Sequence, residues 1–351
     1  MTEQITIAVD AMGGDDAPAM VVRGANLAAR RRPDAAFIFY GDQDAVEPLL
    51  ARADALQNRA RLQHTEITVS GDDKPSNALR RGRKSSMGLA IQAVADGEAA
   101  AVVSAGNTGA LMAMSKFALR TLPGIHRPAI AGVLPTRRGE TVLLDLGANV
   151  ECNADNLVDF AAMGAVFAQT VLARVEPTVG ILNIGNEELK GHDEVREAAA
   201  ILRRADSHFV FHGFVEGDDI AKGTTDVVVT DGFTGNVALK TVEGVSRLFA
   251  DFLRRALGGS LSGRLGYAIA RPAFKSLREK IDPRRHNGAL FLGLNGTVVK
   301  SHGGTDALGF ATALEVAIDM AAGSVNERIL TELEQVHASV APQNQAAIGV
   351  R

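Results

Sequence analysis

An apolar run near the start of the chain ends abruptly in a loop of acids and glycines. Residues 5–10 read Ile-Thr-Ile-Ala-Val-Asp, a pattern typical of a strand, and residues 11–18 read Ala-Met-Gly-Gly-Asp-Asp-Ala-Pro. Paired glycines let the backbone approach a ligand closely, and the N–H groups at a helix N-terminus are free to bind anions. We expect a helix to begin near Pro18, because proline is favoured in a first helical turn.

Five later strands end in the same kind of small, polar, glycine-bearing loop. These loops lie at 104–109, 145–149, 183–188, 230–236 and 301–306. In open α/β sheets, ligands bind in the crevice outside the carboxyl ends of the strands. We therefore expect one shared site built from several of the six loops.

Short β-branched runs alternate with helical patterns along the chain. Strands are predicted at 5–10, 36–40, 101–104, 129–134, 141–145, 179–183, 209–212, 226–230 and 297–300. Helices are predicted at about 18–31, 44–56, 76–96, 107–119, 155–173, 190–205, 234–257, 306–321 and 325–338. This alternation indicates a three-layer α/β fold, with helices on both faces of a mostly parallel sheet.

Two stretches interrupt the alternation, at 123–140 and 258–296. We interpret them as hairpin-like and helical additions rather than as separate domains. The predicted organisation is a single α/β domain over residues 1–338, from which a basic helical segment at about 254–285 protrudes. The tail over 339–351 lacks an apolar face and is expected to be loose.

Composition excludes several classes of protein. Hydrophobic residues make up 46% and charged residues 22%, which is ordinary for a soluble globular enzyme. Tryptophan is absent and the net charge is −4, so the chain lacks the aromatic platform and the basic footprint of nucleic-acid binders. A single cysteine, Cys152, excludes a disulfide within the chain and a cysteine metal cluster. No secretory signal or membrane-spanning run is visible, so a cytoplasmic location is expected.

Five of the loops, in this order, resemble those of the bacterial phosphate acyltransferase family. The matching segments are 9–15, 104–110, 144–149, 183–188 and 231–236, and the resemblance extends over residues 4–337. It implies transfer of a fatty acyl group from acyl carrier protein to inorganic phosphate, which yields acyl phosphate for phospholipid synthesis. It also implies a homodimer, peripheral to the membrane, with a fold related to isocitrate/isopropylmalate dehydrogenases and phosphotransacetylases. Asn186 stands where many relatives carry threonine or serine.

The implied reaction places few demands on side-chain chemistry. Phosphate is already a nucleophile, so no serine or cysteine intermediate and no cofactor are needed. The enzyme must hold a dianion beside the thioester carbonyl, stabilise the developing oxyanion and exclude water. The loops at 106–109 and 234–236, each opening a helix, are candidate anion cradles. The alternative is ordinary helix capping by their asparagine and threonine side chains.

Candidate site residues come from these loops and from nearby cations. Catalytic roles are predicted for Asp10, Lys190, Asp231 and Lys240. Phosphate or substrate binding is predicted for Gly13, Gly14, Ser104, Asn107, Thr108, Asp145, Asn149, Asn183, Thr234, Asn236 and His302. Lys300 is a further source of positive charge. The strand-end aspartates could orient a lysine, accept a proton, bind a cation or cap a helix; no metal is assigned. Cys152 is interpreted as a small buried thiol.

Two basic segments suggest partners. Arg80, Arg81, Arg83 and Lys84 form a cluster without acids that suits docking of the acidic carrier protein, although a solvated helix face explains it equally well. Residues 254–285 carry nine basic and two acidic residues, a net charge of +7. Their apolar positions, Leu261, Leu265 and Ile269, recur at helical spacing, which suits an anionic membrane surface or the other subunit of a dimer. Pro272 is expected to break or kink this segment.

Three other functions remain open. A dehydrogenase of the isocitrate type would need a dinucleotide-binding fingerprint, and 12–15 does not match one. A short-chain phosphotransacetylase would run the same chemistry on coenzyme A thioesters. A non-catalytic membrane scaffold would recruit partners through 254–285, among them the membrane acyltransferase that passes acyl phosphate to glycerol 3-phosphate.

Overall fold

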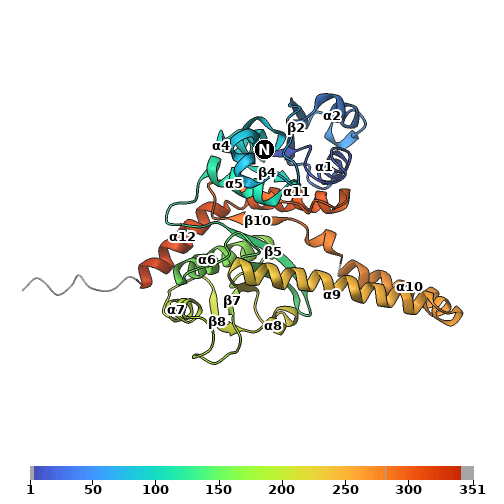
Figure 1. Ribbon diagram of the computed structural model, residues 1–351. Helices are drawn as coiled ribbons and strands as arrows, with labels where there is room; N and C mark the ends of the chain where they lie inside the picture. Colours follow the sequence, from blue (N-terminus) through green and yellow to red (C-terminus); the bar gives the residue numbers. More distant parts are fainter. Residues whose placement is uncertain (1–3, 281, 341–351) are drawn as a thin grey trace, which may run out of the picture.

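The computed structural model describes residues 4–280 and 282–340. Within them, eleven strands form a single sheet in the order β3-β2-β1-β4-β11-β10-β5-β6-β9-β7-β8 (Figure 1). The strands are β1 (Ile5–Asp10), β2 (Ala35–Gly41), β3 (Ala60–His64), β4 (Ala101–Ser104), β5 (Ala129–Thr136), β6 (Gly139–Leu144), β7 (Thr178–Leu182), β8 (Val210–Val215), β9 (Val227–Val229), β10 (Ala289–Leu292) and β11 (Thr297–Lys300). The predicted α/β class with a mostly parallel sheet is confirmed.

Helices cover both faces of the sheet. They are α1 (Ala19–Arg31), α2 (Gln43–Leu50), α3 (Pro75–Arg81), α4 (Ser86–Ala95), α5 (Thr108–Leu119), α6 (Ala154–Val171), α7 (Asp193–Leu202), α8 (Gly217–Lys222), α9 (Gly232–Gly258), α10 (Leu261–Lys280), α11 (Ala307–Ala322) and α12 (Val325–Val340). Short 3₁₀ turns lie at η1 (Asp54–Leu56), η2 (Gly82–Lys84) and η3 (Pro283–His286).

Alternate residues of each strand serve two separate hydrophobic cores. In β1, Ile7 and Val9 face the core under α1, α6 and α11, whereas Ala8 faces the core under α4 and α5. In β2, Phe37 and Phe39 join the first core and Ile38 joins the second. Because successive side chains of a strand point to opposite faces, strands buried on both sides read as continuous apolar runs. That is why the sequence pattern of these strands predicts a sheet covered on both faces.

Strand direction reverses in the middle of the sheet. β10 is antiparallel to both β11 and β5, and β5 is antiparallel to β6. β1, β2, β3, β4 and β11 therefore run one way, and β6, β7, β8 and β9 run the other way. In Figure 1 the blue and cyan segments lie on one side of β10, and the green and yellow segments lie on the other. The sheet thus consists of two parallel halves of opposite direction.

Several predicted boundaries need correction. The helix expected over 76–96 is two helices, because Ser85 caps α4 and a Cβ at Gly88 would lie 2.2 Å from the carbonyl oxygen of Gly82. The strands β3 and β10 and the helix α8 were not predicted, whereas the hairpin expected over 123–140 is present as β5 and β6. The tail expected from 339 begins later, since α12 runs to Val340; residues 341–351 lie outside the described part.

The helices α9 and α10 pack on each other and project from the body of the molecule (Figure 1). The chain turns between them at 259–260, and α10 continues through Pro272, so of the break or kink expected there the break is wrong. The pair leaves large apolar side chains on the surface, including Phe249 and Phe252 on α9 and Ile269 on α10. Among the described helices, none is long and apolar enough to cross a membrane alone; α11 and α12 pass that test only as a bent pair.

Candidate active site

The loops after β1 and β4 join around a buried aspartate. The hydroxyl of Ser104 donates to Oδ2 of Asp10 at 2.6 Å, and the N–H of Gly106 donates to Oγ of Ser104 at 3.0 Å. A Cβ at Gly13 would lie 2.6 Å from both Oδ2 of Asp10 and the N atom of Gly106, so only glycine fits between these loops. We call Asp10, Gly13, Ser104 and Gly106, together with Lys300, the Asp10 cluster.

Lys300, at the end of β11, brings a buried cation to this cluster. Its ammonium donates to the carbonyl oxygens of Ala105, at 3.3 Å, and Ser301, and the residue is 8% exposed. Burial lowers the pKa of Lys300 to about 8, against the opposing effect of the Asp10 and Asp15 charges. Burial raises the pKa of Asp10, and its hydrogen bonds with Ser104 and Ser86 oppose that rise. A buried lysine facing a buried carboxyl, both with perturbed pKa values, is a common mark of a functional site.

The loop after β11 makes hydrogen bonds that join it to the loops after β1 and β4. The N–H of Asp15 donates to the carbonyl oxygen of Gly303 at 3.0 Å, and Gly14 adopts a φ of +109° beside it. His302 is exposed, and its Nδ1 accepts the N–H of Gly304 at 3.1 Å, so this side chain stabilises its own turn. Gly14 and His302 thus lie next to the Asp10 cluster. In this half of the sheet, the loops after β1, β4 and β11 meet, as predicted for a shared site.

The N-terminus of α5 lies directly beyond Ser104 and Gly106. Oδ1 of Asn107 accepts the N–H of Ala110 at 3.0 Å, and its Nδ2 donates to the carbonyl oxygen of Gly71 at 2.7 Å. The capping alternative is therefore correct for Asn107. The next two residues, Thr108 and Gly109, are exposed, and their N–H groups precede any intrahelical acceptor. These two N–H groups and the positive end of the helix dipole are available to an anion.

A second arrangement surrounds Asp145 after β6. Oδ1 of Asp145 accepts the N–H groups of Ile130, Gly147 and Ala148 at 2.9 to 3.1 Å, and Oδ2 accepts the backbone and side-chain N–H groups of Asn149 at 2.7 and 2.9 Å. Both Asp145 and Asn149 are buried. These hydrogen bonds occupy the lone pairs of the carboxylate, so Asp145 organises its loop, and its role in substrate binding stays a prediction. We call these residues the Asp145 cluster.

The start of α9 packs on the Asp145 cluster. Asp231 caps this helix, because its carboxylate accepts both the N–H and the hydroxyl of Thr234 at 2.8 Å. A Cβ at Gly235 would lie 1.9 Å from the carbonyl oxygen of Asp145, which explains the glycine. Asn236 is exposed beside Gly147. Asp231 is thus the residue that caps α9, and Thr234 supplies the N–H that it caps. The side chain of Asn236 is exposed beside them.

The two lysines predicted to be catalytic are surface residues. Lys240, further along α9, is 57% exposed and pairs with Glu243 at 3.0 Å. Lys190 is 48% exposed and pairs with Glu187 at 3.0 Å, while its carbonyl oxygen accepts from Nδ2 of Asn183. Neither lysine contacts the Asp10 cluster in the hydrogen bonds and ion pairs of the described residues.

The sequence led us to expect the six loops at one edge of the sheet. The structure places them at two opposite edges instead. The loops after β1, β4 and β11 leave one edge, whereas those after β6, β7 and β9 leave the opposite edge, because strand direction reverses at β10 and β5. Asp10, Gly13, Gly14, Ser104, Asn107, Thr108 and His302 therefore belong to the first set. Lys190, Asp231, Lys240, Asp145, Asn149, Asn183, Thr234 and Asn236 belong to the second.

Two further groups bear on the chemistry. Cys152 is half-buried, and burial, reinforced by the charges of Asp145 and Asp231, raises its pKa to about 12, so it stays a thiol at neutral pH. Among residues 4–280 and 282–340, no three side chains of His, Cys, Asp or Glu are grouped so that they could hold a metal ion. Sequence reasoning overlooked Ser86 and ranked Lys300 below the exposed lysines; the signal was the position of Lys300 at a strand end directly before a glycine loop.

Comparisons with known proteins identify the family. Residues 5–328 match the family model described as "Fatty acid synthesis protein". A "Phosphate acyltransferase" of Rhodospirillum centenum is 59% identical over 340 residues, covering 97% of this chain and 96% of the relative. The "Phosphate acyltransferase" of Paramagnetospirillum magneticum is 54% identical over 351 residues and covers 100% of both chains.

Solved structures share the fold at low identity. A phosphotransacetylase from Streptococcus pyogenes superposes with a TM-score of 0.62 at 17% identity, covering 91% of this chain and 94% of that one. The EutD phosphotransacetylase from Staphylococcus aureus gives a TM-score of 0.56 at 14% identity, covering 93% and 96%. These likenesses establish the fold, whereas the sequence relatives establish the family. The chain therefore belongs to the phosphate acyltransferase family of acyltransferase enzymes.

Proposed function

We propose that this enzyme transfers a long-chain fatty acyl group from acyl carrier protein to inorganic phosphate, forming acyl phosphate for phospholipid synthesis. Family membership supports the acyl transfer to phosphate. The observation that carries the location of the site is the buried Lys300 ammonium, which lies among three glycine loops close to the N-terminus of α5. A buried cation and free helix N–H groups together form the environment that a phosphate dianion requires.

Direct attack accounts for the reaction at this site. A phosphate held by the N–H groups of Thr108 and Gly109 and by Lys300 would present one oxygen to the thioester carbonyl. The new C–O bond forms as the carbonyl oxygen gains charge, and the C–S bond then breaks to release the carrier thiol. The thiolate takes up the proton that monohydrogen phosphate loses. Asp10 holds the loops of Ser104 and Gly106 in place and balances the lysine charge.

The roles first predicted for Lys190, Asp231 and Lys240 stay predictions. They lie with the Asp145 cluster on the other edge of the sheet, so they would act in binding a remote part of the donor rather than on the phosphate at Lys300. The organisation as a single catalytic domain over 1–338 is likewise a proposal.

Phosphate-dependent thiol release from palmitoyl-acyl carrier protein, with palmitoyl-coenzyme A in parallel, tests the assignment. We expect thiol and acyl phosphate from the carrier-protein donor and little from coenzyme A. Release from coenzyme A instead would identify phosphotransacetylase-like chemistry. No release from either donor would favour a non-catalytic scaffold and overturn the proposal.

We propose that the acidic carrier protein docks on the basic segment formed by the end of α3 and the turn η2, directly before α4. Arg80, Arg81, Arg83 and Lys84 are all exposed there. This segment runs directly into Ser85 and Ser86, and Ser86 reaches Asp10. A docked carrier would thus deliver its thioester close to the Asp10 cluster, and long-range attraction would speed its encounter.

Charge reversal tests this docking surface. Replacing Arg80 and Arg81 with glutamate is expected to raise the KM for palmitoyl-acyl carrier protein about tenfold or more at low salt, with kcat nearly unchanged, because rim charges mainly affect encounter. The matched control is Arg52→Glu, an exposed arginine on another surface. An unchanged KM in the double variant, or an equal rise in the control, would contradict docking at this segment.

We propose that α9 and α10 serve contact with an anionic membrane and with a second subunit of a homodimer, in a cytoplasmic, peripherally attached enzyme. Leu265 and Ile269 are 64% and 75% exposed on the basic helix α10; the side chain of Leu261, the third residue predicted for this contact, lies outside the described part. Apolar side chains amid arginines suit the interface of an anionic bilayer. Attachment there would place acyl phosphate near the membrane acyltransferase expected to consume it.

Vesicle flotation tests the membrane contact. Leu265→Glu with Ile269→Glu is expected to remove most binding to phosphatidylglycerol vesicles, since two exposed apolar side chains that would enter the bilayer are exchanged for two charges repelled by the lipid. The control is Val175→Glu, which alters a side chain that is 94% exposed on the body of the molecule. Unchanged flotation of the double variant would assign α10 to subunit contact alone.

A further inference from the structure

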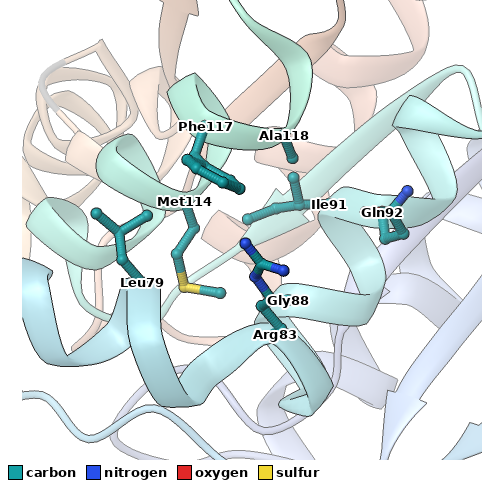
Figure 2. Close-up of a pocket in the computed structure, with 8 residues that line it drawn as sticks. All are labelled: Leu79, Arg83, Gly88, Ile91, Gln92, Met114, Phe117 and Ala118. Carbon is teal, nitrogen blue, oxygen red and sulfur yellow. The ribbon is translucent and has the colours of Figure 1, made fainter.

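A small, partly apolar groove lies between α3, α4, α5 and the turn η2. It has a volume of about 150 Å³, and Figure 2 shows its lining residues: Leu79, Arg83, Gly88, Ile91, Gln92, Met114, Phe117 and Ala118. An engineered cavity of about 150 Å³ in another protein holds benzene, so this groove has room for roughly six carbon atoms. Its walls combine apolar side chains with the polar Arg83 and Gln92, and its floor is part of the core under α4 and α5, since Ile91 and Met114 are buried there.

The groove lies on the same helix as the proposed phosphate site. Met114 and Phe117 are six and nine residues beyond Thr108 on α5, which corresponds to about 9 and 14 Å along the helix at 1.5 Å per residue. A short acyl group attached to a thioester at the N-terminus of α5 would not reach the groove. A long-chain acyl group would reach it, and its hydrocarbon would be removed from water there.

One cation borders the groove. The guanidinium of Arg83 lies over the ring of Phe117, 5.0 Å from its centroid, and Figure 2 shows it reaching from η2 into the space between α4 and α5. Phe117 is 61% exposed, so it is a large aromatic ring at the surface held by a cation rather than by core packing. Arg83 also belongs to the basic segment proposed for carrier docking. An acidic partner that attracts Arg83 would release Phe117 and open the groove.

We infer that this groove seats the middle of the fatty acyl chain and that Arg83 and Phe117 form its gate. The inference rests on the proposed function and deepens it, because it names the part of the chain that selects long acyl groups. Met114 suits this role, since its flexible thioether side chain adapts to the shape of a bound hydrocarbon. The competing occupant, an apolar side chain of the carrier protein, would affect donors of every chain length equally.

Filling the groove separates these occupants. Ala118→Phe adds a ring from a partly exposed position that lines the groove, and Ala118→Ser is the matched control of nearly conserved size. With Ala118→Phe we expect kcat/KM for the palmitoyl donor to fall about tenfold or more and that for the butyryl donor to stay within about twofold, because a misfit of even one methylene in a hydrophobic pocket costs about 10- to 200-fold. An equal fall for both donors would assign the groove to the carrier protein, and no fall for either would overturn the inference.

A binding measurement keeps the inference independent of turnover. Fluorescence of cis-parinaric acid should rise on mixing with the wild-type protein and with Ala118→Ser, and should rise much less with Ala118→Phe. Phe117→Ala removes one side of the gate and is expected to weaken probe binding less than Ala118→Phe does, because Ile91 and Met114 still line the groove. If wild type transfers no acyl group from any donor, the proposed function fails, and the probe still reports whether the groove binds hydrocarbon. If transfer proceeds and Ala118→Phe retains full probe binding, the groove is not the acyl site.

Discussion

Replacing Lys300 with methionine is expected to lower kcat/KM for phosphate by about a hundredfold or more, the loss typical of removing one preorganised donor from a charged transition state. The ammonium is buried beside the free N-terminus of α5 and has no neighbour that could replace its charge there among the described contacts. Methionine keeps the length and apolar stem of lysine, so the loops should keep their packing. Steady-state kinetics with varied phosphate measures the effect.

The pH dependence gives this prediction a second readout. Burial lowers the pKa of Lys300 to about 8, so the cation is present below that pH and is lost above it. Wild-type kcat/KM for phosphate should therefore fall as pH rises through about 8, and Lys300→Met should lack this descending limb. Lys116→Met, on the exposed face of α5, is the control and should keep both the rate and the limb. If Lys300→Met kept the wild-type dependence of kcat/KM on pH, Lys300 would not be part of the phosphate site.

The largest effect on stability is expected at Asp145. Substitution by alanine leaves the N–H groups of Ile130, Gly147, Ala148 and Asn149 without their acceptor, and those of Ile130 and Asn149 are buried. Each unpaired buried donor costs about 1–3 kcal/mol, and partial access of water to the loop reduces the sum. We therefore expect the free energy of unfolding to fall by about 4 kcal/mol or more, measured by urea denaturation at a fixed pH.

The control for Asp145 is an aspartate that accepts a single N–H. Asp42 caps α2 through the N–H of Asp44 alone in the described hydrogen bonds. Asp42→Ala should cost about 1 kcal/mol, as loss of an N-cap usually does. Similar losses in the two variants would show that the loop of Asp145 satisfies its donors by another route, and that the carboxylate does not organise it.

Local sequence predicted most of the architecture because most of it follows from local patterns. Strands such as Val102 and Val103 of β4 are short apolar runs bounded by glycine loops, and burial on both faces requires that composition. β3 was missed because it is an edge strand that reads Ala-Arg-Leu-Gln-His and leaves Arg61 and Gln63 exposed or half-exposed. β10 was missed because it follows a long helical pair and was interpreted as part of it.

Strand direction could not be predicted from the sequence. For that reason the loops of the predicted single site lie at two opposite edges of the sheet. The residues of β10 and β5 do not indicate that these strands pair antiparallel with their neighbours, because pairing direction depends on the path of the whole chain. The prediction therefore merged two edges of the sheet into one. It also favoured the lysines nearest a matched loop, Lys190 and Lys240, over Lys300, whose burial becomes visible only when β11 is placed beside β4.

The pairing of β11 with β4 has a consequence for how the protein is synthesised. β4 ends at Ser104, and its partner β11 begins at Thr297, so 192 residues separate the two. Until the ribosome has released β11, the nascent amino-terminal half carries an unpaired strand edge of the kind that invites association with other chains. Lys300 completes the Asp10 cluster in the same step, so the growing chain gains the buried charge of this cluster only when that exposed edge is closed.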